Sequence, residues 1–266
     1  MGSMHMDVDT YVERARKLDT TGIDFDAFVR NPLSGDALRC LRYMHDVEGH
    51  TVCYLRDLLV TSAHRDAELT TFLTVWNYEE LFHAQAIADV LALHGEVAGR
   101  TRIEAHRKGL GWRDRLAPLL HLLGSWVVGP AYGAVHMTWG AVNEWTTQAG
   151  YARLAARANH PELTELLRRI MRQEGRHIDY YASRASKLLE SSSRARRVTR
   201  AALRRFWAPV GATVMPKSEV RFLVGYLFGD DEGRSVAKRI DRNVDRLPGL
   251  GALHLIEGSV DTLNAA

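Results

Sequence analysis

The sequence lacks the features that mark several large classes of protein. Only two cysteines are present, Cys40 and Cys53, and they form neither a CxxC pair nor the framework of a disulfide-stabilised fold. The net charge is +3 over 266 residues, which is too small for a protein whose whole surface binds nucleic acid. We therefore expect two free thiols and no nucleic-acid partner.

Long apolar runs are also missing. The most apolar stretch, residues 116–135, is interrupted by His121 and Pro130, whereas a membrane span needs about 20 apolar residues. The opening Met-Gly-Ser-Met-His-Met has no apolar core of the kind found in signal peptides, and it looks like a cloning remnant. The sequence thus predicts a cytoplasmic protein without a membrane span.

What is present is a helical pattern. Hydrophobic residues make up 46% of the chain and recur at helical spacing almost throughout, while alternating runs bounded by turn residues are absent. Four long helices are predicted, over residues 37–61, 64–94, 132–158 and 161–189. A long crossover with a shorter helix at 116–128 separates them into two pairs. This arrangement favours an all-α fold, a ferritin-like four-helix bundle over residues 7–192.

The C-terminal part is predicted to add further helices. They are expected over residues 193–207, 219–228 and 232–244, with a loop around 209–216. Residues 193–266 are therefore interpreted as a helical extension packed on the same domain.

The bundle carries a Glu-x-x-His motif twice. Glu80 and His83 lie in the second long helix. Glu174 and His177 lie in the fourth. Because three residues make just under one helical turn, each motif puts a carboxylate and an imidazole on one helix face, where both can bind one metal ion.

Two more glutamates complete the pattern. Glu48 precedes Glu80 by 32 residues, and Glu144 precedes the Glu of the second motif by 30. Neighbouring antiparallel helices bring residues about 30 apart to one level, so six ligands are predicted to converge. They are Glu48, Glu80, His83, Glu144, Glu174 and His177. Four carboxylates in a dry core need cations, and two divalent ions with oxygen and imidazole ligands suit iron or manganese.

These motifs resemble those of the ferritin-like di-iron carboxylate proteins, in particular the soluble acyl-carrier-protein desaturases. In that family a Trp, two spacers, Glu-Glu and a His follow one another, as Trp76, Glu79, Glu80 and His83 do here. The resemblance covers residues 36–190 and extends to a Thr one turn after the metal-binding Glu of the third helix, which is Thr147 here. It implies two iron ions, with manganese as the alternative, dioxygen as cosubstrate and Thr147 as a catalytic residue that handles dioxygen.

Some positions depart from the patterns of this family and its relatives. Gln173 stands where desaturases have an Asp that accepts the ring N–H of a ligating His; an amide still accepts but carries no charge. Ile87 replaces the radical-storing Tyr of ribonucleotide reductases, and Ile170 replaces a seventh ligand of di-iron N-oxygenases. The chain is also shorter than the plant desaturases, which weakens the inference of a carrier-bound substrate.

The predicted function is desaturation or hydroxylation of an apolar substrate, most naturally a carrier-bound acyl chain. The resemblance implies a ferredoxin-like electron donor, an acyl carrier protein, an apolar small-molecule substrate and, by analogy with relatives, a homodimer. Three alternatives stay open: a ferroxidase or peroxide-handling protein, a di-iron hydroxylase or N-oxygenase of secondary metabolism, and a metal-free interaction module.

Several other residues allow two interpretations. Glu79 is either an acceptor for the outer N–H of His177 or a surface glutamate, and Thr147 either lines an oxygen pocket or bonds back to its own turn. His45 and His50 flank Glu48 but are interpreted as non-ligands. Four large side chains near the ligands either shape a substrate channel or belong to the core; they are Trp76, Met137, Trp139 and Trp145.

The glycines of the crossover and the arginine-rich segment each allow more than one role. Glycines of the crossover and third helix permit close packing or leave space for a ligand; they are Gly124, Gly129, Gly133 and Gly140. The basic run at 194–205 is either a solvated face, a dock for an acidic carrier protein or a membrane-surface helix. Its opposite face is expected to bury Val198, Ala201, Leu203 and Phe206.

Overall fold

A computed structural model of the chain describes residues 6–264, apart from the side chains of residues 113 and 264. Residues 1–5, most of the opening segment interpreted as a cloning remnant, lie outside this range. Every regular element within it is a helix, as the apolar periodicity predicts. Internal contacts divide the chain into two compact units. The first unit consists of residues 8–124 and 154–173, and the second of residues 125–153 and 174–266 together with the N-terminal end.

The first unit is built around the long helix α5 (Ala67–Leu93), which several other helices of this unit contact. They are α1 (Val8–Arg14), α2 (Asp26–Arg30), α3 (Gly35–Glu48), α4 (Thr51–Leu59), the 3₁₀ helix η1 (Ser62–Arg65) and α6 (Gly99–Gly109). The helix α7 (Gly111–Val128) begins in this unit. Asp66 caps α5 by accepting from the Leu69 N–H, and Gly95 follows the helix with a positive φ of +73°.

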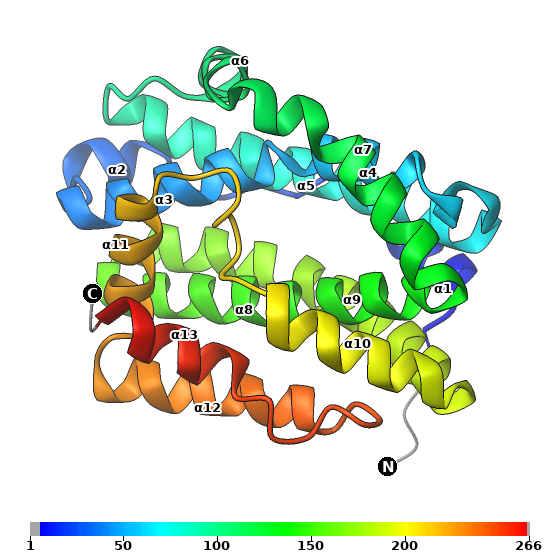
Figure 1. The fold of residues 1–266 in the computed structure, drawn as a ribbon. Coiled ribbons are helices and arrows are strands. Elements are labelled where there is room, and N and C mark those ends of the chain that lie inside the picture. Colours follow the sequence, from blue (N-terminus) through cyan, green and yellow to red (C-terminus); the bar gives the residue numbers. More distant parts are fainter. Residues whose placement is uncertain (1–5, 265–266) are drawn as a thin grey trace. The chain divides into compact units, whose positions relative to one another are not determined.

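The second unit contains most of α8 (Tyr132–Ala158) and the second half of α9 (Pro161–Ser191). It also holds η2 (Gly129–Ala131) and four C-terminal helices, which are α10 (Ser193–Phe206), α11 (Lys217–Phe228), α12 (Asp231–Asp245) and α13 (Leu255–Asn264). The last three pack against one another, as Figure 1 shows in orange and red. The predicted ferritin-like bundle over residues 7–192, with a helical extension over 193–266 packed on the same domain, stays a prediction.

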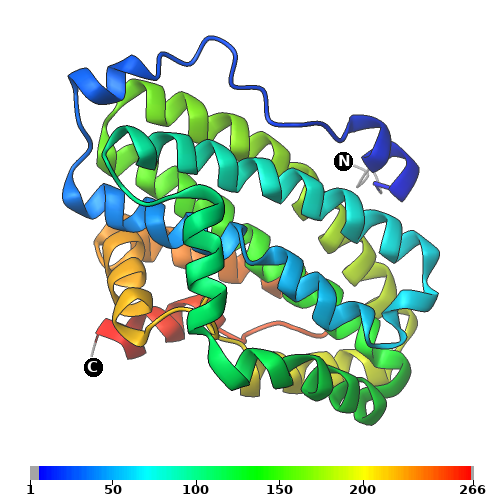
Figure 2. The ribbon, with the colours of Figure 1, turned by 90° about the horizontal axis from the view of Figure 1, so that it is seen from above.

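The prediction of one helix over residues 37–61 is wrong, because the chain breaks between α3 and α4. Figure 2 shows the two as separate blue segments. The Gly49 carbonyl accepts from the Arg107 guanidinium, and the Cys53 N–H bonds instead to the His50 carbonyl. A Cβ at Gly49 would lie 2.7 Å from Ile103 Cδ1, the end of a flexible side chain, so a larger residue here would require Ile103 to move. Contacts with α6 therefore end α3.

The other long helices follow their predictions closely. The second begins at Ala67 rather than residue 64 because η1 precedes it, the third is α8 as predicted, and the fourth runs on to Ser191. The crossover helix extends back to Gly111, and the sequence interpretation missed α6 before it. The three predicted C-terminal helices are α10, α11 and α12, whereas α13 was not predicted.

The predicted apolar face of α10 is partly wrong. Its buried residues are Ala195, Thr199 and Leu203, whereas Phe206 is 68% exposed. The buried face is narrow because neighbouring arginines also bond within the unit. Arg196 donates to the Leu189 carbonyl, for example. In the described residues no helix is both long and apolar enough to cross a membrane.

The role of Gly140 in α8 is close packing. A Cβ placed there would lie 2.3 Å from the ring of the buried Tyr181 on α9. Gly124 of α7, in contrast, has open space where a Cβ would lie.

Substitution Gly140→Ala is therefore expected to destabilise the fold by about 1–3 kcal/mol, because the Tyr181 ring would have to move in a packed core. The free energy of unfolding in urea measures this. The matched control is Gly124→Ala, which should leave stability unchanged or raise it by up to about 1 kcal/mol through helix propensity. Equal effects of the two substitutions would contradict the packing role of Gly140.

Candidate metal centre

The first unit gathers three of the six predicted ligands. Glu48 is the last residue of α3, and Glu80 and His83 lie in the middle of α5, against which α3 packs. All three are at most 5% exposed. One ligand atom from each lies within 4.8 Å of the others. We call these three residues the first cluster.

Gln173 orients the ring of His83. The amide nitrogen of Gln173 donates to the Arg16 carbonyl at 2.9 Å, so Oε1 is the atom that faces His83, 2.8 Å from the ring Nε2. An amide oxygen only accepts hydrogen bonds, which places the proton of a neutral imidazole on Nε2. The prediction that Gln173 accepts a histidine N–H is confirmed for His83.

The other ring nitrogen of His83 faces a carboxylate. Nδ1 lies 3.0 Å from Glu80 Oε2. A lone pair on Nδ1 and a carboxylate oxygen repel each other at this distance unless they share a proton or a metal ion. Adjacent ligands of an octahedral ion with bonds of about 2.1 Å lie about 3.0 Å apart. The pair therefore has the spacing and donor chemistry of two metal ligands.

The second unit repeats this arrangement with the other three ligands. Glu144 of α8 is 6% exposed, and Glu174 and His177 of α9 are fully buried. His177 Nδ1 lies 3.1 Å from Glu174 Oε2 and 4.0 Å from Glu144 Oε2. We call these three residues the second cluster, in which one ligand atom from each also lies within 4.8 Å of the others. Both Glu-x-x-His motifs thus adopt the local geometry that their spacing predicts.

The interpretation of Glu79 as a surface glutamate is wrong. Its side chain is fully buried and accepts from the Tyr11 hydroxyl at 2.8 Å and from the Arg16 backbone N–H at 3.2 Å. Arg16 thus contributes its N–H to Glu79 and its carbonyl to Gln173. Sequence reasoning missed Tyr11 and Arg16, because they lie in an N-terminal segment for which no element was predicted.

Thr147 lies on α8 one turn after Glu144 and is half-buried. The plain alternative, a helical threonine that bonds back to its own turn, applies to its neighbour Thr146, whose hydroxyl donates to the Val142 carbonyl at 2.8 Å. No hydrogen bond to the Thr147 side chain is found among the described residues. Its hydroxyl is therefore available for another partner.

The two histidines beside Glu48 have different surroundings. His45 is fully buried, with Nδ1 3.1 Å from Asp46 Oδ1 and Nε2 accepting from the Gly99 N–H. Both of its nitrogens are engaged, which agrees with its interpretation as a non-ligand. His50 lies beyond the helix break. The pKa of its ring is lowered to about 4, mainly by burial and to a smaller extent by the nearby His106.

Two of the four large side chains near the ligands are core residues. Trp76 and Met137 are at most 5% exposed, and Trp76 stacks edge-on with Tyr54. Trp139 and Trp145 are half-buried, so their part in a substrate channel stays a prediction.

Comparison of the sequence with models of protein families finds no match, and comparison with curated proteins finds none either. The function is therefore inferred from the side chains described above.

Replacement of Tyr11 by Phe tests the tether of Glu79. Loss of the hydroxyl leaves a buried carboxylate short of one donor, and we expect the free energy of unfolding to fall by about 1–3 kcal/mol. Urea unfolding of the metal-free protein measures the change. Tyr78→Phe is the control, because Tyr78 is 47% exposed and should tolerate the same loss. A Tyr11→Phe variant as stable as the control would rule out the tether.

Proposed function

We propose that the chain is a ferritin-like di-metal oxidase that uses dioxygen to desaturate or hydroxylate an apolar substrate. The observation that carries this proposal is the repeated cluster of two glutamates and one histidine. In each cluster a buried Nδ1 and a carboxylate oxygen lie at the spacing of adjacent metal ligands, 3.0 and 3.1 Å. Six ligands of this kind suit two ions of iron, with manganese as the alternative.

The two clusters are linked along the chain, and we assign their six ligands to one centre on the pattern of the di-iron carboxylate proteins. Gln173 bonds to His83 of the first cluster, and the next residue of α9 is Glu174 of the second. Consecutive Cα atoms are about 3.8 Å apart, so these two ligands are linked through a single peptide unit and one hydrogen bond. A bundle with Glu-x-x-His on two of its helices provides such a centre in the di-iron carboxylate proteins.

Charge also favours two ions. The four glutamates of the clusters are at most 6% exposed, and without cations their carboxylates would repel one another or take up protons. Two divalent ions balance four carboxylates. A bound redox-active pair would supply the electrons that activate dioxygen for attack on a C–H bond.

The chain's own residues would orient the metal ligands of this centre and supply a proton to it. Gln173 holds the proton of His83 on Nε2 and leaves Nδ1 as the ligand atom. The Thr147 hydroxyl, one turn from Glu144, is proposed as the proton donor on the dioxygen side. Buried Ile87 and Ile170 replace the Tyr of radical-storing relatives and the extra ligand of N-oxygenases, which favours oxidation of carbon.

The partners follow from the same proposal. A ferredoxin-like protein would supply the electrons, and an acyl carrier protein would present an apolar chain. Four arginines of α10 are exposed and could contact an acidic carrier; they are Arg194, Arg197, Arg204 and Arg205.

Metal content tests the centre directly. Protein reconstituted with Fe(II) should hold about two ions per chain and gain about 5 °C or more in Tm over the metal-free form. Glu80→Gln and Glu174→Gln should lose both the ions and the gain in Tm. Each should leave the metal-free protein as stable as before or more stable, because one of several crowded charges is removed.

Glu104→Gln is the matched control, since the Glu104 side chain is 69% exposed on α6 and lies outside both clusters. It should keep the metal and the gain in Tm. Protein that stays metal-free after reconstitution would overturn the proposed centre and leave the interaction module as the function.

Turnover tests the chemistry. With a ferredoxin, its reductase, dioxygen and acyl-carrier-protein substrates, the loaded enzyme should yield an alkene or an alcohol, and Thr147→Val should lower the rate by about 10²–10⁴-fold if its hydroxyl is the proton donor. Mass spectrometry of the released acyl chain measures both. Rapid oxidation of added Fe(II) without any change in the acyl chain would instead indicate a ferroxidase.

A further inference from the structure

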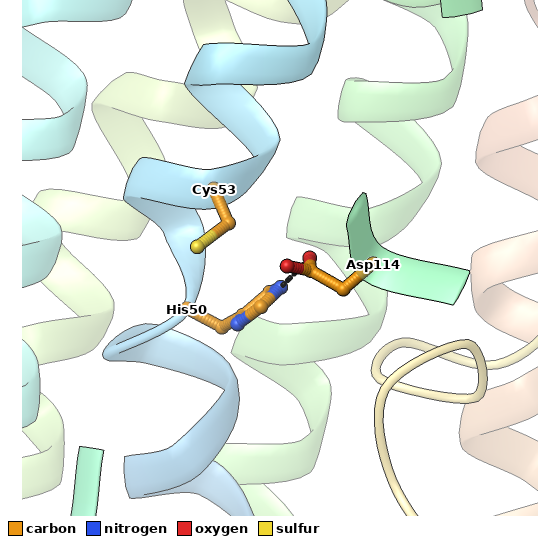
Figure 3. A group of neighbouring side chains, drawn as sticks. All are labelled: His50, Cys53 and Asp114. Atoms are coloured by element: carbon orange, nitrogen blue, oxygen red, sulfur yellow. Dashed lines mark ion pairs between the residues drawn. The ribbon is translucent and has the colours of Figure 1, made fainter. Parts of the chain in front are cut away.

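A second group of metal-ligand types lies in the first unit, apart from the two clusters. His50, Cys53 and Asp114 each place one ligand atom within 4.8 Å of the others. Figure 3 shows the His50 ring turned toward the Asp114 carboxylate, with the Cys53 side chain above the ring. His50 Nε2 lies 3.9 Å from Asp114 Oδ1, which is too far for a hydrogen bond.

His50 is buried, and its ring nitrogens make no hydrogen bond to the described residues. It is 8% exposed, its Nδ1 has no hydrogen-bond partner among the described residues, and no bond to Nε2 is found there either. The ring of His106 lies edge-on to it with centroids 5.7 Å apart, and its Nε2 lacks a partner as well. Buried imidazoles without partners are uncommon and indicate a missing ion or water.

These residues lie at the ends of helices. The break after Glu48 makes His50 the residue before α4, and Cys53 follows in the first turn of that helix. Asp114 lies in the first turn of α7, where Arg56 donates to both of its carboxylate oxygens. Each carboxylate oxygen has two lone pairs, so Oδ1 can bind an ion and still accept from Arg56.

We propose that His50, Cys53 and Asp114 bind a single divalent ion of the zinc class. A thiolate, an imidazole and a carboxylate are the donors that zinc takes in proteins. In a tetrahedral zinc site the ligand atoms lie about 3.3–3.6 Å apart, so the group, whose ligand atoms lie within 4.8 Å of one another, needs to contract by at most about 1.5 Å to close around the ion. Water takes the fourth position.

The ion ties the start of α4 to the start of α7 within the first unit. It shares no ligand with the two clusters, and no thiol belongs to either of them. A thiolate signal therefore reports this site alone, whether or not the proposed oxidase centre exists.

The test is a Co(II) titration of the full chain after treatment with a chelator, because Co(II) takes the place of zinc and a bound thiolate gives a near-ultraviolet charge-transfer band. The wild type should develop this band, and added Zn(II) should remove it. Cys53→Ser should abolish the band and bind one Zn(II) fewer per chain. Cys40→Ser, which changes the only other cysteine, should retain it.

Asp114→Asn keeps the thiol and should shift the titration to more than about tenfold higher Co(II). Glu80→Gln should keep the band, which separates this site from the proposed oxidase centre. Circular dichroism and Tm of each metal-free variant show that it is folded. Absence of the band in the wild type, or its retention in folded Cys53→Ser protein, would overturn the proposal.

Discussion

The burial of carboxylates next to imidazoles is the constraint on which the proposed metal centre depends. Glu80 lies 3.0 Å from the His83 Nδ1, and Glu174 lies 3.1 Å from the His177 Nδ1, both pairs out of contact with water. Such pairs cost several kcal/mol to bury unless a cation completes them. The motif repeats in each compact unit with nearly the same distance, 3.0 and 3.1 Å, and this repetition is the basis of the metal centre that we propose.

In the first cluster, an uncharged hydrogen-bond acceptor determines which nitrogen of the His83 ring carries the proton. Gln173 accepts from His83 and donates to the Arg16 carbonyl, so both ends of its amide are used. An Asp in this place would add a negative charge and make the imidazole a stronger donor to a metal. Gln173 keeps the orientation without that charge. The charged acceptor nearby is Glu79, which Tyr11 and Arg16 hold in the core.

Local patterns in the sequence were sufficient for three of the four predicted long helices and for the Glu-x-x-His motifs. Apolar spacing and terminal signals predicted α5, α8 and α9, and the spacing of Glu and His predicted which side chains share a helix face. Contacts between distant residues were beyond the same reasoning. The break after Glu48 depends on Arg107, 58 residues after Gly49, and the burial of Glu79 depends on Tyr11, 68 residues earlier. Neither contact produces a periodic pattern in the sequence.

The break between α3 and α4 separates the two proposed metal sites along the chain. In one continuous helix, Glu48 and Cys53 would be five residues apart and would point about 140° away from each other on a single rigid rod. The Arg107 bond to the Gly49 carbonyl and the close contact of Ile103 end the first helix instead. Glu48 can then lie against α5 with Glu80 and His83 of the first cluster, while the chain beyond Gly49 turns a thiol and an imidazole toward Asp114. Gly49, whose carbonyl accepts from Arg107, is therefore the point at which the chain separates these two groups of side chains.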